Sequence, residues 1–320
     1  MTRKAAAPGP CPPAKDTAID CSGYRARLQE LNGHVHADPY RDSESFLREA
    51  ALAASGLPDA MLQSLHTFRL EGNRDGFLLL RGMPVAGKSC AECCLALIGS
   101  RLGDIVGYLQ EKGGALFHDL LPEREQENEQ SAAGSRMPLA LHTERCFHPH
   151  LPSHVLLLCL RPDPGRKALT EIASVRRMLP LLPPEHVQTL FLPAFRTGID
   201  YSFGNVTTEK ANGPVLSVLY GDRDDPCLRY DLDLMAGLDP LAPAALASVK
   251  RAANLAGTKL ALQAGDLLVI DNSRAVHGRT AFTARYDHRD RWLKRSYLVR
   301  ELAAITTDRL PGERVIRTAF

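Results

Sequence analysis

The chain has 320 residues, 44% of them hydrophobic, which is enough to bury one large core. Its 39 Lys and Arg residues nearly balance 37 Asp and Glu residues, and only 6% of the chain is aromatic. This composition argues against a nucleic-acid partner and favours a small molecule. The longest apolar runs, such as VLLLCL at 155–160, are far shorter than the about 20 residues of a membrane helix, so no membrane partner is expected.

The N-terminal residues MTRKAAAPGPCPPAKD lack the apolar core of a secretory signal. Their Pro, Ala and Lys content predicts a disordered arm over residues 1–19. We therefore expect a cytoplasmic protein whose eight cysteines are free thiols. Residues 20–320 contain no internal repeat and no Gly/Ser linker, which predicts a single domain and leaves the oligomeric state open.

Helical periodicity extends from residue 43 to about 67, with a break before PDAM, and a short apolar strand follows at 77–81. Residues 122–137, PEREQENEQSAAGSRM, have no apolar periodicity, and a loop of this length often serves as a lid over a site. After residue 138 strands outnumber helices, and their connections are too short for helical crossovers. These patterns predict a mainly β protein with antiparallel sheets and flanking helices.

The segment Gly82–Ser89, GMPVAGKS, matches the phosphate loop of nucleotide-binding ATPases. The run LLVID at 267–271 could supply an acid for Mg²⁺. Such a site requires a parallel, helix-wrapped sheet, which the second half of the chain does not predict. We therefore favour a turn after the strand at 77–81, with Ser89 as the N-cap of the next helix.

That next helix carries Cys90, Cys93 and Cys94, which could suggest a zinc site. With Leu97 and Ile98, these cysteines follow the i, i+3, i+4, i+7, i+8 spacing of a buried helix face. Packing in the core is therefore favoured over metal binding.

The stretch LALHTERCFHPH places His142 and Glu144 two residues apart, so that on a strand both side chains emerge on one face. Similar His-x-acid pairs begin at His36 and His288, but only the middle pair follows apolar residues and has a distant histidine and arginine to complement it.

The distant residues are His277, after a strand, and Arg291, 14 residues later. Two histidines and one carboxylate can hold Fe(II) in a facial triad that leaves positions open. Arg291 could clamp a carboxylate through two parallel hydrogen bonds. With the triad complete, His148 and His150 are assigned to packing or hydrogen bonding.

The segments HTE, DNSRAVHGRTAF, RWLKRSY and YGDRDDPCLRYD resemble the clavaminate synthase-like branch of the Fe(II)/2-oxoglutarate oxygenases, which includes hydroxylases of free arginine, asparagine and lysine. The likeness extends from about residue 20 to 300, and the use of Glu144 in place of Asp is typical of this branch. It implies a double-stranded β-helix (jelly-roll) core with helices outside. It also implies Fe(II), 2-oxoglutarate and O₂ as cofactor and co-substrates.

The resemblance also implies roles for individual residues. The expected iron ligands are His142, Glu144 and His277. The distal carboxylate of 2-oxoglutarate is expected at Arg291 and Thr170. The expected substrate-binding residues are Arg295 for the α-carboxylate, Asp231 and Asp200 for the side chain, Gln110 for the amino group, and Glu144. Arg229 could neutralise Asp231 and so favour an amide side chain.

The expected function is hydroxylation of a free L-amino acid, with arginine or lysine first, in natural-product biosynthesis. An amide amino acid as substrate, and desaturation or cyclisation as reaction, remain alternatives. The ATPase at Gly82–Ser89 is the alternative of another class. A metal-binding module without catalysis is disfavoured because Arg291 and Thr170 accompany the triad.

Overall fold

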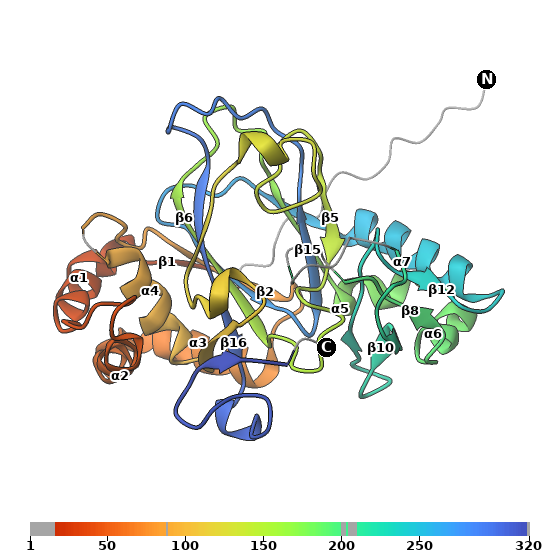
Figure 1. Ribbon diagram of the computed structural model, residues 1–320, viewed down its shortest axis with the longest axis horizontal. Coiled ribbons are helices and arrows are strands. Elements are labelled where there is room, and N and C mark those ends of the chain that lie inside the picture. The colour runs from red at the N-terminus through yellow and green to blue at the C-terminus, as the bar shows by residue number, and fades with distance from the viewer. Residues whose placement is uncertain (1–16, 88, 200–202, 204–209, 319–320) are drawn as a thin grey trace.

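Two β-sheets face each other at the centre of the structure, a computed structural model that describes residues 17–87, 89–199, 203 and 210–318 (Figure 1). The larger sheet has the order β1 (Ala18–Asp20), β2 (Phe77–Arg81), β14 (Leu267–Asp271), β6 (His154–Arg161), β16 (Trp292–Val299), β3 (Asp104–Tyr108) and β17 (Val315–Ile316), with β4 (His118–Leu120) paired to β16. The smaller sheet has the order β13 (Thr258–Leu260), β7 (Thr170–Ser174), β15 (Ala275–Arg279) and β5 (Leu139–His142).

Short strands extend the region beside the smaller sheet. They are β8 (Phe195–Arg196), β9 (Val215–Leu216), β10 (Leu219–Tyr220), β11 (Cys227–Leu228) and β12 (Ala236–Gly237). Within the two main sheets the described pairings are antiparallel, except for β1 with β2 and β17 with β3. Two facing, mainly antiparallel sheets with helices outside form the jelly-roll core predicted from the sequence.

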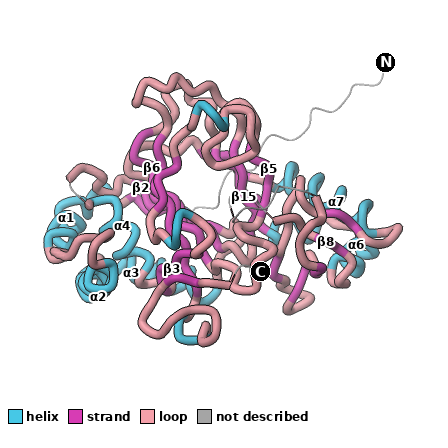
Figure 2. Tube along the Cα trace, in the orientation of Figure 1, coloured by secondary structure: helices cyan, strands magenta, loops and turns pink. Residues whose placement is uncertain are grey.

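Helices cover the outer faces of both sheets (Figures 1 and 2). Beside the larger sheet lie α1 (Arg25–Gly33), α2 (Ser43–Ala53), α3 (Asp59–Glu71) and α4 (Cys90–Gly99). Beside the smaller sheet lie α5 (Val175–Met178), α6 (Pro184–Leu190) and α7 (Ala242–Ala256). No helix in the described part of the chain is both long and apolar enough to cross a membrane.

Strand β2 shows how the layers divide the core. Leu78 and Leu80 pack into the apolar cluster shared with α1–α4, whereas Phe77 and Leu79 belong to the cluster between the sheets. Successive strand residues point to opposite faces, so both faces of β2 are buried. This is why the strands of the larger sheet read as continuous apolar runs such as FLLL and LLVI.

The folded part of the chain begins earlier than predicted. Thr17 is buried and its hydroxyl donates to Asp75 Oδ2 at 2.6 Å, and β1 starts at Ala18. Residues 17–19, predicted to belong to the disordered arm, are therefore ordered, and residues 18 and 19 are part of the sheet. The remainder of that arm lies outside the described residues.

The segment Gly82–Ser89 does not lie in the sheet that a phosphate loop requires. Strand β2 before it pairs antiparallel with β14, the strand that contains LLVID. Gly82 has φ +79°, and a Cβ there would lie 3.2 Å from the Ser22 backbone nitrogen, so this glycine serves a close approach of two chain segments. Ser89 is the N-cap residue of α4, as predicted, although its side chain makes no capping hydrogen bond.

The cysteine-bearing helix α4 is buried on all sides. Every residue from Cys90 to Gly99 is buried, which confirms packing and extends it beyond the single face that the spacing predicted. Cys90 and Cys94 both donate to the Pro84 carbonyl at 3.2 Å. The seven described cysteines are free.

We expect the helical layer and the sheets to unfold together. Phe46 on α2 is fully buried and packs edge-to-face on Phe117, with ring centroids 5.9 Å apart. Phe46→Leu should lower the free energy of unfolding by about 1 to 2 kcal/mol, because the aromatic pair is lost and the space is filled imperfectly. Urea unfolding followed by circular dichroism should show one transition shifted as a whole, whereas the exposed Leu52→Ala control on the same helix should barely shift it. Two separate transitions would contradict a single domain.

Candidate active site

Three predicted metal ligands meet between the two sheets. His277 on β15 lies directly opposite His142 on β5, and their ring centroids are 4.6 Å apart. Glu144 Oε2 is 3.6 Å from His277 Nε2 and 4.0 Å from His142 Nε2. One ligand atom from each residue lies within 4.8 Å of the other two, so all three can bind one ion.

Glu144 reaches this position differently from what the sequence predicted. Strand β5 ends at His142, so Glu144 lies in the following turn and not on a shared strand face. The fully buried Asn272, in the turn between β14 and β15, holds the Glu144 backbone: its Oδ1 accepts from Glu144 N at 2.8 Å and its Nδ2 donates to Glu144 O at 3.0 Å. Asn272 thereby connects the two ligand-bearing segments, and the sequence analysis did not identify it.

The protonation states of the triad suit metal binding. His142 Nδ1 lies 2.8 Å from the Ala140 carbonyl, which can only accept, so Nδ1 carries the proton and Nε2 presents its lone pair. Burial lowers the pKa of His277 below its usual range, which favours the neutral ring. Burial by itself would raise the pKa of Glu144, but Arg295 and His277 outweigh it and hold that pKa well below its usual range. Two neutral imidazoles and a carboxylate are a donor set suited to Fe(II).

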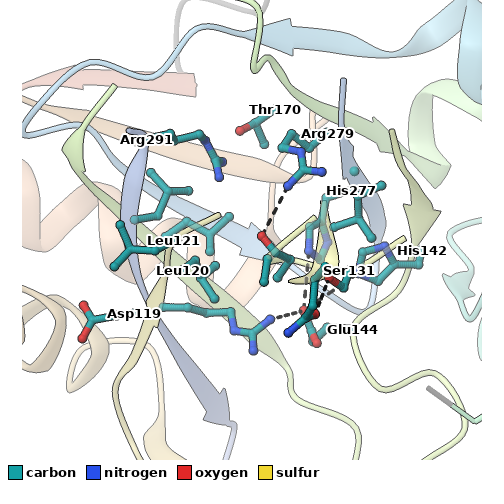
Figure 3. A pocket seen from close by; sticks show the side chains of 18 of the residues that line it. Asp119, Leu120, Leu121, Ser131, His142, Glu144, Thr170, His277, Arg279 and Arg291 are labelled. Atoms are coloured by element: carbon teal, nitrogen blue, oxygen red, sulfur yellow. Dashed lines mark hydrogen bonds and ion pairs between the residues drawn. The ribbon is translucent and has the colours of Figure 1, made fainter. Parts of the chain in front are cut away.

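A cavity of about 210 Å³ adjoins the triad. Figure 3 shows Thr170 and Arg291 among its lining residues, with the triad across the cavity. Burial lowers the pKa of Arg291 to about 10, so its guanidinium stays charged near neutral pH. Within the described residues Arg291 has no hydrogen-bond partner or ion pair, and the buried Thr170 hydroxyl has none either. An uncompensated guanidinium beside an unpaired hydroxyl suits an anionic carboxylate at this end of the cavity.

A second arginine at this end was missed by the sequence analysis. Arg279 lies two residues after His277 on β15 and pairs in register with Thr170 on β7, so it faces the same cavity. It is buried, and burial together with the charge of Arg291 lowers its pKa to about 9. The alternation that relates residues i and i+2 on a strand applies to His277 and Arg279 and could have identified it.

On the other side of the triad, carboxylates and guanidinium groups form a buried cluster. Arg295 Nη2 donates to Glu111 Oε1 at 2.6 Å and its Nη1 to Glu144 Oε2 at 3.4 Å. Arg145 also pairs with Glu111, and Tyr297 donates to Glu144 Oε1 at 3.0 Å. Burial by itself would raise the pKa of Glu111, but Arg145 and Arg295 lower it to about 2. The predicted Arg295 is thus beside the metal site, and Glu111 is a lining residue that the sequence analysis overlooked.

Gln110 and Asp231 are not among the residues that line this cavity, although Asp231 adjoins the candidate ligand His142. Gln110 Nε2 donates to the Arg317 carbonyl at 2.8 Å, and its neighbour Glu111 faces the cavity. Asp231 forms an isolated bridge with His142, and its Oδ1 accepts from the backbone of residues 233 and 234. Burial raises the pKa of Asp231.

The remaining predicted residues are accounted for as follows. Arg229 stacks over the Tyr220 ring at 5.2 Å and forms no ion pair with Asp231 among the described residues. His148 and His150 form hydrogen bonds to Thr318 O and Asp308 Oδ2, as predicted. Asp200 lies outside the described residues.

The facing sheets and the His–Glu–His triad define a jelly-roll protein with a candidate mononuclear metal centre. Residues 56–297 match the family described as "Taurine catabolism dioxygenase TauD, TfdA family", and the chain belongs to this family. Clavaminate synthase 2 of Streptomyces clavuligerus is 35% identical over 297 residues, which cover 88% of this chain and 91% of the relative. L-lysine 3-hydroxylase of Catenulispora acidiphila is 32% identical over 318 residues, covering 93% of this chain and 88% of the relative.

Solved structures show the same likeness. Asparagine oxygenase in complex with Fe(II), 3-hydroxyasparagine and succinate matches with a TM-score of 0.86 and 33% identity, over 94% of this chain and 99% of that one. The non-heme iron oxygenase OrfP in complex with Fe and alpha-ketoglutaric acid matches with a TM-score of 0.81 and 28% identity, over 93% and 99% of the two chains.

Proposed function

We propose that the protein is an Fe(II)/2-oxoglutarate-dependent hydroxylase of a free L-amino acid, with a basic amino acid as substrate. The observation that carries this proposal is one cavity in which a His–Glu–His triad adjoins Arg291 and Thr170, whose side chains have no polar partner among the described residues. The structures of related oxygenases with iron and alpha-ketoglutaric acid or succinate support it. The free described cysteines agree with the cytoplasm as the site of the reaction.

His142, Glu144 and His277 would hold the iron, and Arg291 with Thr170 would hold the distal carboxylate of 2-oxoglutarate. Together, the bound iron and co-substrate supply the oxidation, in which O₂ and 2-oxoglutarate are converted to succinate and CO₂ while a C–H bond of the amino acid becomes C–OH. The chain's own contribution is to orient both organic molecules and to exclude water. Asn272 would keep Glu144 in place, because it bonds both backbone atoms of that residue.

The cluster of Glu111 and Arg295 suits the zwitterionic end of an amino acid. A guanidinium can receive an α-carboxylate through two parallel hydrogen bonds, and the neighbouring carboxylate can accept from an α-ammonium. In the described structure these two side chains pair with each other at 2.6 Å. A ligand that carries both charges can enter the pair without leaving either buried charge unbalanced.

Asp231 supports a basic side chain on the substrate. It is next to His142, and among the described residues no donor reaches its Oδ2. The related hydroxylases named for lysine and for ornithine and arginine are consistent with a cationic substrate. The related asparagine oxygenase makes an amide amino acid the competing choice.

A substrate panel tests the proposal. Purified protein with Fe(II), ascorbate and 2-oxoglutarate should form succinate when arginine, lysine or ornithine is added, together with an amino-acid product 16 Da heavier. The gain of one oxygen distinguishes hydroxylation from desaturation or cyclisation. If none of the twenty amino acids nor ornithine stimulates succinate formation, the amino-acid hydroxylase proposal is wrong.

Arg291→Met should weaken 2-oxoglutarate binding about tenfold to thirtyfold, because the distal carboxylate loses the guanidinium expected to bind it through two parallel hydrogen bonds. Anaerobic calorimetry with Mn(II) in place of Fe(II) measures this affinity directly. Arg161→Met is a suitable control, since Arg161 bonds the Asp290 carbonyl and stacks over Trp292 outside the cavity. Equal affinities in the wild type and Arg291→Met would remove Arg291 from the co-substrate site.

A further inference from the structure

We infer that Arg279 is a positioning residue that fastens residues 122–137 over the co-substrate end of the cavity. The inference rests on the proposed function and adds to it a role for Arg279 and the closure of residues 122–137. Arg279 is buried on β15, and its guanidinium bonds backbone carbonyls of a segment more than 140 residues earlier in the chain.

The contacts identify what the guanidinium holds. Arg279 Nη1 donates to the Ala132 carbonyl at 3.3 Å and Nη2 donates to the Met137 carbonyl at 3.1 Å. The segment between these carbonyls belongs to the loop that lines the cavity through Ser131, Ala132 and Ala133. Figure 3 shows Arg279 near His277, with a dashed line marking a hydrogen bond of its guanidinium. The rigid, planar guanidinium of Arg279 therefore connects β15 in the cavity wall with the loop at 122–137 that covers the cavity.

Neighbouring contacts fasten the same loop to the chain that follows β15. Phe282 N donates to the Ser135 carbonyl at 2.9 Å, and Arg124 lies over the Tyr286 ring at 4.4 Å. The Tyr286 hydroxyl is 3.3 Å from Ser135 Oγ. Phe282 and Ser135 are buried, whereas Arg124 and Tyr286 are exposed or partly exposed. Arg279 is the contact that lies beside the candidate metal ligands.

The charge around Arg279 explains why this contact should respond to 2-oxoglutarate. Among the described residues Arg279 pairs with no carboxylate, and Arg291 is the like charge that acts on it. Two guanidiniums at one end of a cavity repel each other until an anion enters. A dianion held by Arg291 would reduce this repulsion and strengthen the hold of Arg279 on Ala132 and Met137. Closure of 122–137 would then follow co-substrate binding and exclude water from the site.

Limited proteolysis without any ligand tests the contact itself. The segment contains Glu123, Glu125, Glu127 and Glu129, so endoproteinase Glu-C reports its opening. Arg279→Met should raise the rate of cleavage within 122–137 about tenfold or more, because two hydrogen bonds from a charged donor are lost. Arg279→Lys should give an intermediate rate, since an ammonium does not match the fork that spans two carbonyls. Tyr286→Phe, which removes the long hydroxyl contacts to Ser135 and Glu127 and keeps the ring, should change the rate less than threefold.

The melting temperature of each variant shows whether the substitution destabilises the whole protein or only the loop. Cleavage in 122–137 that accelerates while cleavage elsewhere and the melting temperature stay near wild type supports a local role. Equal cleavage rates in the wild type and Arg279→Met, or acceleration throughout the chain, would overturn the inference.

The second arm adds 2-oxoglutarate and Mn(II) under argon. The wild type should become about threefold to tenfold more resistant within 122–137, and Arg279→Met should lose this protection while calorimetry still detects co-substrate binding. If calorimetry shows no binding of 2-oxoglutarate to the wild type, the proposed function is wrong. The proteolysis of wild type and Arg279→Met without ligand still tests whether Arg279 holds the loop. If the wild type binds 2-oxoglutarate but residues 122–137 do not become more resistant to cleavage, the inference that co-substrate binding closes this loop is wrong.

Discussion

His277→Ala and, separately, His142→Ala should abolish iron-dependent turnover while the protein remains folded. Each histidine supplies one of three ligand atoms that lie within 4.8 Å of one another, and two remaining ligands hold Fe(II) too weakly. Activity should fall by more than about 100-fold, beyond the 10- to 100-fold typical of residues that only orient a ligand. Succinate formation with excess Fe(II), and metal content after anaerobic dialysis, measure the two consequences.

His150→Ala provides the matched control. His150 lies eight residues from His142 and bonds Asp308 instead of facing the cavity, so its loss should leave turnover within about twofold of the wild type. Thermal unfolding of all three variants shows whether the fold is retained. Retained turnover in a folded His277→Ala variant would refute the facial triad.

The sequence was sufficient to predict the elements with regular apolar patterns. The runs at 77–81 and 267–271 became β2 and β14, which pair directly with each other. Burial on both faces makes such strands easy to recognise, because nearly every position is apolar. Pairing order is harder to predict, since β14 lies between β2 and β6, which precede it in the chain by more than 100 residues.

The candidate site was predicted best where chemistry is tied to residue type. His142, Glu144 and His277 meet because β5 and β15 are neighbours, although Glu144 is placed by a turn that no strand rule describes. Asn272 acts through backbone atoms of Glu144, and such contacts leave no periodic signal in a sequence. Local patterns therefore identified the candidate ligands but not the residue that holds one of them.

The side chain of a turn residue that faces a cavity is also hard to predict. Gln110 was predicted to contact the substrate, and the structure adds the neighbouring Glu111 as a lining residue, because the chain turns after β3 and alternation no longer decides which side chain faces inward. The phosphate-loop motif has another explanation. Its glycine pattern matched, but Gly82 serves the approach of the Ser22 backbone in an antiparallel environment.

The choice of substrate should depend on Asp231. Asp231→Asn should lower kcat/KM for a basic amino acid by about 2 to 5 kcal/mol, the range for leaving one member of a buried charge pair without its partner. Asparagine is preferable to alanine at this position, because Asp231 Oδ1 accepts from Asp233 N at 3.0 Å and Leu234 N at 2.8 Å. The amide oxygen can keep this turn, so the variant removes the charge alone.

Asp239→Asn is the matched control for that substitution. Asp239 Oδ1 also accepts two backbone hydrogen bonds, from Leu241 N and Ala242 N at 2.8 Å, but this turn begins α7, whereas Asp231 is bridged to His142. Its variant should keep wild-type kinetics for every amino acid, whereas Asp231→Asn should lose activity with arginine, lysine or ornithine more than with asparagine or glutamine. If the wild type hydroxylates asparagine and none of the basic amino acids, the carboxylate of Asp231 does not select a cation. An amide substrate would then replace the basic one, and the metal and co-substrate assignments would stand unchanged, because neither depends on Asp231.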